Sequence, residues 1–151
     1  AGEYEAELRA QAAGMERVIF TGRLEPEALP AWYSNARALI VPSLCYETFG
    51  IIIIEAFRGG TPVIARKLGP FPEIIAKGGG LLFETEADLR AAIADLGSAP
   101  ARRDALAKQA RAAYEENWKE DVVITEYLDV VRKAARAKGN KHVISALEAE
   151  T

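Results

Sequence analysis

The sequence has 151 residues, half of them hydrophobic, with 19 basic and 22 acidic side chains and a net charge of −3. This size and apolar content allow one substantial core, so we expect a globular domain and exclude a disordered chain. The mixed charge gives no general electrostatic reason to expect a nucleic-acid or anionic-membrane partner. The apolar runs fall short of the roughly 20 residues that span a bilayer, and the acidic start is unlike a secretory signal. We therefore expect a cytoplasmic protein without a transmembrane segment.

Helices and short apolar segments alternate through the first part of the chain. Residues 3–13 mix apolar and charged side chains as an amphipathic helix does, and Val18-Ile19-Phe20, closed by Thr21-Gly22, has the form of a strand buried on both faces. About four strands that alternate with helices predict a Rossmann-like α/β fold, an open parallel sheet with flanking helices. The other predicted elements are a helix over 27–36, a strand over 38–41, a helix over 50–58, a strand over 62–65, a short helix over 72–77 and a strand over 81–83.

The segment 50–58 contains four consecutive isoleucines, which favour a strand by propensity. Two parallel strands need a crossover, which is usually helical, and this segment is the only material between Val41 and Val63 that can form one. Gly59-Gly60 and Pro62 then end the helix. Because a helix that is apolar nearly all round is a buried helix, we expect it to lie against the sheet.

The remainder of the chain is predicted to be helical over 86–96, 101–117 and 120–138. Beyond Gly139-Asn140 the chain is short and polar, and we assign it no role. We therefore expect a domain over residues 1–138 and a polar C-terminal tail over 139–151. The glycines 78–80 precede a strand and do not open a helix, so we expect a tight turn there and no phosphate-binding loop.

Covalent and metal chemistry have few candidate residues. Cys45 is the only cysteine and His142 the only histidine, and they are far apart in the sequence. We therefore expect no internal disulfide, no metal cluster and no cysteine–histidine nucleophile pair.

The stretch after Val41 is the candidate site, because it holds Glu47, Gly50 and Glu55. Ligands of open parallel sheets bind outside the carboxyl ends of the strands, where this loop lies. The start of the next helix presents unpaired amide N–H groups with about half a positive charge, and Gly50 lets an anion approach them. This is the form of a diphosphate cradle. Glu55, about one and a half turns into the helix, can accept hydrogen bonds from sugar hydroxyls, and Glu47 would lie on the opposite side of the anion.

Three basic side chains near this stretch leave alternatives open. Glu55 could instead form a salt bridge with Arg58 or Arg66, since an unpaired buried charge is costly. Arg66 and Lys67 either help to bind phosphate or lie in a solvated loop.

Several short motifs follow one another in a fixed order in the middle of the chain: Pro42-Ser43, Glu47-Thr48-Phe49-Gly50, Glu55-Ala56, Gly60-Thr61-Pro62-Val63-Ile64-Ala65, Gly69 and Pro72-Glu73-Ile74-Ile75, before a glycine-rich turn. This ordered set closely resembles the donor-binding domain of glycosyltransferase family 4, whose members are retaining enzymes with the two-domain GT-B fold. The resemblance covers roughly residues 1–130.

The resemblance implies part of a hexosyltransferase of carbohydrate biosynthesis whose donor substrate is a nucleoside diphosphate sugar. It implies that Glu55 binds the nucleotide ribose and that Glu47 acts in catalysis beside the transferred sugar. Thr48 and the main chain of Phe49-Gly50-Ile51 would contact sugar and phosphate, and Gly22-Arg23-Leu24 would contact the nucleobase through its backbone. Members of the family use no obligatory metal and no protein nucleophile.

The sequence also departs from the family. Its members are considerably longer and begin with an acceptor-binding domain, and the opening strands of their donor domain precede the point that matches Ala1. We therefore expect a partial donor domain that is inactive alone, with the N-terminal acceptor-binding domain as its missing partner. Two alternatives stay open: a stand-alone nucleotide-binding module without catalytic activity, and another GT-B enzyme such as a nucleotide-sugar epimerase.

Overall fold

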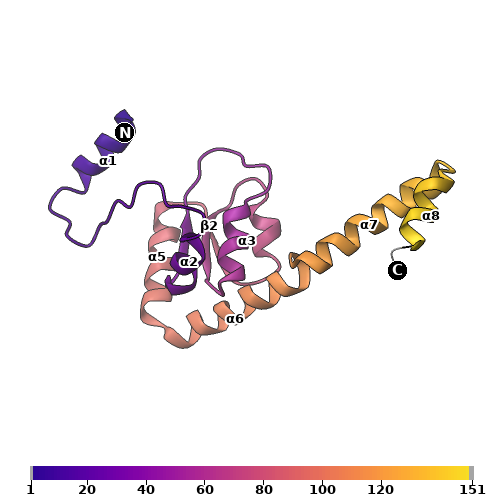
Figure 1. The fold of residues 1–151 in the computed structure, drawn as a ribbon. Helices are drawn as coiled ribbons and strands as arrows, with labels where there is room; N and C mark the ends of the chain where they lie inside the picture. The colour runs from indigo at the N-terminus through magenta and orange to yellow at the C-terminus, as the bar shows by residue number, and fades with distance from the viewer. Residues whose placement is uncertain (1, 150–151) are drawn as a thin grey trace.

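The computed structural model describes residues 2–149, so Ala1 and the last two residues of the predicted tail lie outside it. An α/β body forms the centre of the molecule, α1 lies apart on one side, and α7 projects from the other with α8 packed at its end (Figure 1). The elements in chain order are α1 (Glu3–Gln11), α2 (Leu29–Asn35), β1 (Leu39–Val41), α3 (Ile51–Arg58), β2 (Val63–Arg66), α4 (Phe71–Ile75), β3 (Gly80–Phe83), α5 (Glu86–Ser98), α6 (Pro100–Asn117), α7 (Glu120–Ala137) and α8 (Lys141–Ala149).

The sheet has three parallel strands in the order β1-β2-β3. Its register pairs Leu39 with Val63 and Val63 with Gly80. Because successive side chains of a strand point to opposite faces, the central strand contributes to two cores. Val63 and Ala65 pack with α3, α4 and α6, whereas Ile64 packs with α5. Helices thus cover both faces of a parallel sheet, which confirms the predicted α/β class.

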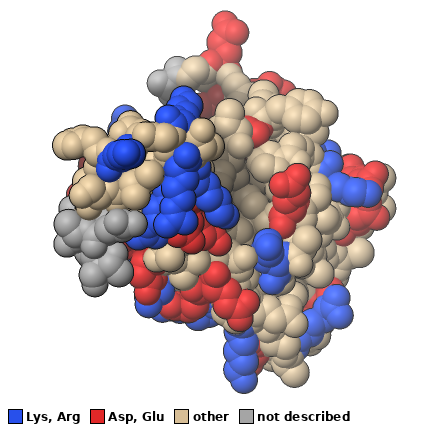
Figure 2. All heavy atoms as spheres, turned by 90° about the vertical axis from the view of Figure 1, so that its right-hand side faces the viewer, with Lys and Arg blue, Asp and Glu red and all other residues tan. Residues whose placement is uncertain are grey.

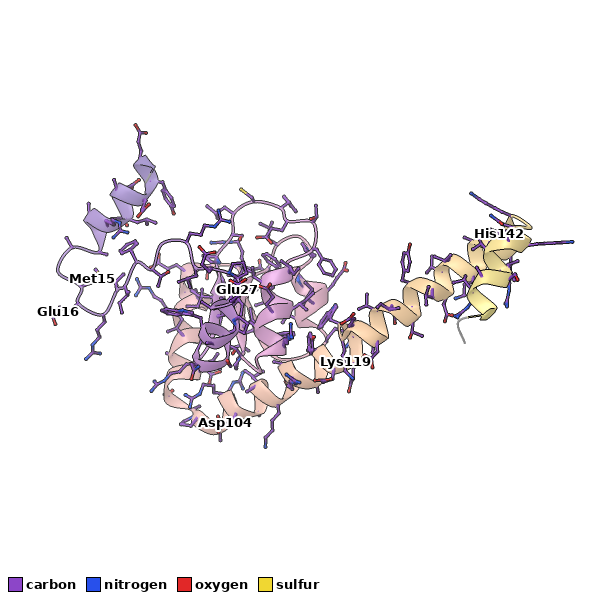
Figure 3. The ribbon with its side chains drawn as sticks, in the orientation of Figure 1. Met15, Glu16, Glu27, Asp104, Lys119 and His142 are labelled. Carbon is purple, nitrogen blue, oxygen red and sulfur yellow. The ribbon has the colours of Figure 1, made fainter. Side chains whose placement is uncertain are left out.

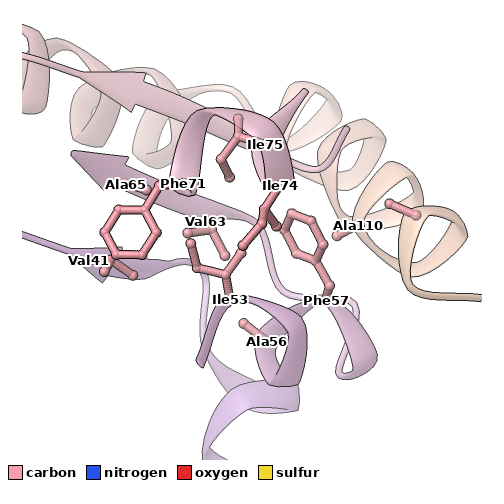
Figure 4. Close-up of a cluster of buried hydrophobic side chains, with 11 residues drawn as sticks. Val41, Ile53, Ala56, Phe57, Val63, Ala65, Phe71, Ile74, Ile75 and Ala110 are labelled. Atoms are coloured by element: carbon pink, nitrogen blue, oxygen red, sulfur yellow. The ribbon is translucent and has the colours of Figure 1, made fainter. Parts of the chain in front are cut away.

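The larger core lies between the sheet and α3, and Figure 4 shows side chains from three helices meeting over Val63. Ile53 and Phe57 of α3 are fully buried, and the Phe57 ring centre is 6.0 Å from that of Trp118. The prediction of a helix through the four isoleucines is therefore confirmed. The buried members of this core are Val41, Ile53, Ala56, Phe57, Val63, Ala65, Phe71, Ile74, Ile75, Ala110 and Ala113.

Helix α3 ends at its glycine pair, as predicted. Gly60 has a φ of +70°, which glycine adopts without steric cost. Its N–H donates to the Phe57 carbonyl (2.9 Å), and the N–H of Thr61 donates to the Ala56 carbonyl (2.9 Å). These two bonds form a Schellman ending, which satisfies the last carbonyls of the helix and turns the chain into β2.

The prediction of a strand at Val18–Phe20 is wrong. The segment is irregular, and the Ile19 side chain is 78% exposed. A strand forms only where another strand offers its backbone for hydrogen bonds. Within residues 2–149 the sheet consists of β1, β2 and β3, and Val18–Phe20 pairs with none of them. The sheet therefore has three described strands, and the prediction of about four is too high.

The predicted polar tail contains a helix, α8, up to residue 149. Gly139, with a φ of +64°, turns the chain, and Asn140 Oδ1 then accepts the N–H of Val143 (3.3 Å) as a helix cap. Val143 and Ile144 are partly buried, and α8 packs along the end of α7. The overall polarity of the segment concealed these signals, although the capping asparagine and the apolar pair were readable in the sequence.

Helix α7 leaves the body with much of its apolar surface uncovered. Its buried residue is Ala135, whereas Val123, Ile124, Tyr127 and Val130 are 44–65% exposed. Figure 2, which looks onto this end of the molecule, shows basic and acidic side chains next to one another, as the mixed composition predicts. In the part of the chain that the structure describes, no helix combines the length and apolar character that crossing a membrane requires.

Helix α5 begins with a reciprocal cap that links its stability to pH. Thr85 Oγ1 accepts the N–H of Asp88 (3.2 Å), and Asp88 Oδ2 accepts the N–H of Thr85 (2.9 Å). The hydrogen bonds from Thr85 hold the pKa of the Asp88 carboxyl below its ordinary value of 3.8. The folded state thus favours the carboxylate, and its stabilisation is present above that value and lost as the pH falls through the lower, folded-state pKa.

We expect Asp88→Asn to lower the free energy of unfolding slightly at pH 7, with the difference from the parent protein shrinking below about pH 4. Urea unfolding followed by circular dichroism at pH 7, 5, 4 and 3 measures this. The matched control is Asp104→Asn in α6, because the Asp104 side chain is exposed and forms no hydrogen bond or ion pair within residues 2–149. If the loss of unfolding free energy in Asp88→Asn did not change with pH, the role of the Asp88 carboxylate as a helix cap would be contradicted.

Candidate functional site

The loop between β1 and α3 carries the first predicted site residue, Glu47. This loop leaves the carboxyl end of β1, where ligands of such sheets bind. Glu47 is half-buried, and its Oε1 accepts a hydrogen bond from Ser43 Oγ (3.0 Å). The loop after β2 lies directly against it, because a Cβ at Gly69 would be 3.6 Å from the Glu47 carbonyl oxygen. The Glu47 main chain therefore packs against the loop after β2, and Ser43 of its own loop holds the carboxylate.

Gly50 makes the turn from this loop into α3. It is buried and has a φ of +81°, and a Cβ at this position would lie 2.9 Å from the Phe71 ring. The N–H of Ile53 bonds to the Gly50 carbonyl (3.0 Å). The N–H groups of Gly50, Ile51 and Ile52 have no partner in the described part of the chain. Three amides at the positive end of a helix dipole can accept an anion.

An open hollow of about 540 Å³ lies beside this helix start. It is bordered by consecutive residues of the loop and of the first helical turn, and the apolar side chains of Phe49 and Ile51 are 55% and 60% exposed there. The structure thus brings together Glu47, Thr48, Phe49, Gly50 and Ile51.

Glu55 borders a second space, a cavity of about 460 Å³ between α2, α3 and α6. Ile51, Glu55 and Arg58 form an accessible stripe on α3, whose residues Ile53, Ile54, Ala56 and Phe57 are buried. Glu55 is four residues beyond Ile51 and therefore about 6 Å further along the axis. Glu47 therefore borders the hollow at the start of α3, and Glu55 borders the cavity beside the same helix. The two glutamates do not share one cavity.

The hydrogen-bond partner of Glu55 is Tyr33, to which sequence reasoning had given no role in the site. Tyr33 Oη donates to Glu55 Oε2 at 3.0 Å. Burial, this hydrogen bond and the negative charge of Glu55 together raise the pKa of Tyr33 to about 12. The alternative of a salt bridge to Arg58 or Arg66 is wrong, because neither side chain pairs with Glu55 among the described residues.

The basic side chains at the end of β2 and directly after it contact the end of β3. The Arg66 guanidinium lies 4.9 Å from the centre of the Phe83 ring, and Lys67 Nζ pairs with Glu84 at 2.7 Å. Lys67 and Glu84 are both more than half exposed, at 55% and 62%. Of the two alternatives for this loop, the geometry favours the solvated one.

The predicted nucleobase segment, Gly22-Arg23-Leu24, borders neither space. Pro26, two residues further along, lines the Glu55 cavity, so the segment leads up to it. Cys45 is exposed in the loop before Glu47, whereas His142 lies on α8 at the far end of α7 (Figure 3). Within residues 2–149 no group of three or more potential metal-ligating side chains occurs.

Comparison with known proteins places this geometry in a family. The chain matches the family described as glycosyl transferases group 1 over residues 1–113. It is 32% identical over 149 residues to the phosphatidyl-myo-inositol mannosyltransferase of Mycobacterium leprae (strain TN), a match that covers 93% of this chain and 38% of that protein. It is 30% identical over 144 residues to the GDP-mannose-dependent monoacylated alpha-(1-6)-phosphatidylinositol monomannoside mannosyltransferase of Corynebacterium glutamicum, covering 89% of this chain and 38% of that protein. The chain thus spans 38% of the length of each of these relatives.

Two solved structures have the same fold. Sucrose-phosphate synthase from Thermosynechococcus elongatus superposes with a TM-score of 0.77 and 29% identity, over 88% of this chain and 34% of that one. Anabaena HepE in complex with UDP and glucose superposes with a TM-score of 0.77 and 23% identity, over 87% of this chain and 37% of that one. The chain therefore belongs to the glycosyl transferases group 1 family and has the fold of the C-terminal domain of GT-B glycosyltransferases.

Proposed function

We propose that this chain is the donor-binding part of a retaining glycosyltransferase, which transfers a hexosyl group from a nucleoside diphosphate sugar to an acceptor hydroxyl. The observation that carries the proposal is the arrangement along α3: free amides at its start, Glu47 in the loop before it and Glu55 on its accessible face. The names of the relatives support a sugar nucleotide, since one is described as GDP-mannose-dependent. HepE, with the same fold, is described in complex with UDP and glucose.

The diphosphate would bind at the start of α3. The amides of Gly50, Ile51 and Ile52 offer hydrogen bonds there, and Thr48 and the Phe49 main chain border the same hollow. These fixed donors would stabilise the charge that develops on the departing nucleoside diphosphate, which is the largest electrostatic demand of the reaction.

The two glutamates would act on different parts of the donor. Glu47, held by Ser43, would accept hydrogen bonds from the transferred sugar and orient it, with no covalent bond to the protein. Glu55 would accept the ribose hydroxyls, as the acidic residue of a dinucleotide site does. The backbone of Gly22-Arg23-Leu24, which leads to the Glu55 cavity, would contact the base.

The acceptor would come from a second domain. The relatives are far longer than this chain, which leaves room in them for an acceptor-binding domain before the matched region. We expect the chain alone to bind the nucleotide and to transfer no sugar, because closure of a second domain over the hollow would exclude water and complete the site. No metal is required in this scheme, since the amides carry the phosphate charge.

Calorimetric titration of UDP and of GDP into the chain tests the proposal. We expect one of them to bind, and Glu55→Gln to weaken that binding about 10-fold or more, since a hydrogen bond to a charged group contributes about 1.5–3 kcal/mol. Glu116→Gln is the matched control, because Glu116 is exposed on α6, outside both spaces. Binding of neither nucleotide at millimolar concentration, or equal affinity of the Glu55→Gln variant, would overturn the proposal.

A further inference from the structure

Tyr33 holds one oxygen of Glu55 and leaves the other free. Its hydroxyl donates to Oε2 at 3.0 Å, and within the described chain Oε1 makes no hydrogen bond. A carboxylate has about four acceptor positions, so donation from Tyr33 leaves room for further donors. Because its pKa is about 12, the Tyr33 hydroxyl keeps its proton at physiological pH and remains a donor.

The tyrosine itself is fixed to the far end of the helix that carries Glu55. Thr61, which is 1% exposed, donates its hydroxyl to the Tyr33 carbonyl. A Cβ at Gly59 would lie 3.3 Å from Tyr33 Cβ and 3.2 Å from the Ser34 nitrogen, so α2 packs directly onto the glycine turn after α3. Tyr33 therefore cannot shift relative to α3 without disturbing this turn.

A glutamate with several rotatable bonds loses rotamer freedom when it binds a ligand, and this loss weakens binding unless the protein has already fixed the side chain. The contact with Tyr33 fixes Glu55 before any ligand arrives. The only other charged groups beside it in the cavity, Arg58 and Arg111, do not pair with it in the part of the chain described.

We propose that Tyr33 is a positioning residue for the donor nucleotide: it holds Glu55 so that the free carboxylate oxygen meets the 2′- and 3′-hydroxyls of the ribose. The inference rests on the proposed function and adds to it a residue that touches Glu55 and not the reacting atoms. Tyr33 thereby contributes to selection of ribose over ligands that lack these hydroxyls.

Tyr33→Phe removes the hydroxyl and keeps the ring that packs on α3. We would titrate UDP, GDP and their 2′,3′-dideoxy forms into the parent chain and into this variant, with Tyr127→Phe on the exposed face of α7 as the control. In the variant we expect ribonucleotide affinity to fall about 3- to 10-fold, which is the effect of losing one hydrogen bond. Dideoxynucleotide affinity should stay unchanged. The preference for ribose should therefore shrink by the same factor.

The outcomes separate this inference from the proposed function. If the parent chain binds neither UDP nor GDP, the proposed function fails and the role of Tyr33 fails with it. If the parent binds and prefers ribose but Tyr33→Phe keeps the full preference, the role of Tyr33 alone is overturned. Equal weakening of ribo- and dideoxynucleotides in the variant also overturns it, because that pattern reports a general structural role.

Discussion

Gly79→Ala is expected to remove about 2–5 kcal/mol of unfolding free energy, as the sum of steric overlap and left-handed backbone strain. Gly79 has a φ of +81°, and a Cβ there would lie 2.4 Å from Ala110 Cα and 2.6 Å from Ala110 N. The overlap is with the backbone of α6, so no side-chain rotation relieves it. Helix α6 would have to move away from β3, and the core that it closes would open.

The matched control separates overlap from strain. Gly139→Ala places a side chain at a similar φ of +64° with nothing within 4 Å, so only the strain of about 1–2 kcal/mol should appear. Urea unfolding of both variants by circular dichroism measures the two losses. Equal losses would show that β3 and α6 do not approach as closely as the structure has them.

Phe57→Ala should cost about 3–5 kcal/mol, the usual loss when a buried aromatic ring is truncated. Phe57 is fully buried, with a relative exposure of 0%, and it packs with core residues of α3, with the sheet and with Trp118. Removal of the ring leaves a void beneath α3. Because Glu55 lies on the opposite face of the same helix, we also expect weaker nucleotide binding in this variant.

A second phenylalanine in the same region provides the comparison. Phe49 is 55% exposed, so Phe49→Ala should change the free energy of unfolding by no more than about 0.5 kcal/mol. Both variants can be followed by urea unfolding and by the fluorescence of Trp118, which lies beside Phe57. A loss for Phe57→Ala no larger than that for Phe49→Ala would contradict the packing described here.

The alternation of strands and helices in the middle of the chain was predictable because each element is decided locally or by its neighbours. The four isoleucines are an example: propensity favours a strand, but a parallel pair needs a crossover, and the burial of Ile53 and Ile54 fits a helix enclosed by the sheet and α6. The tight turn at glycines 78–80 was also predictable from the sequence. In the structure two of these glycines have a positive φ.

Val18–Phe20 shows where sequence reasoning fails. Its apolar run has the composition of a strand, but a strand exists only beside another strand, and composition does not say whether the neighbour is present. Helix α8 was missed for the opposite reason, because a polar segment can fold onto a helix that offers it an apolar surface.

The candidate site was partly predictable. Glu47, Gly50 and Glu55 were chosen from their positions around the start of a helix. The structure places Glu47 in the loop before α3, Gly50 at its cap and Glu55 within it, and their roles stay proposals. Tyr33 was not chosen, because it is 22 residues before Glu55 and the sequence offered arginines as nearer partners. Only the packing of α2 on the turn after α3 brings the two side chains together.

The projecting helix α7 converts small rotations at its base into large movements of its far end. Its 18 residues give a length of about 27 Å, and it joins the body through the short link at Trp118 and Lys119. A rotation of only about 10° at that link would move the far end by roughly 5 Å over this length. Small changes in how Trp118 packs against Phe57 would therefore become large displacements of α8.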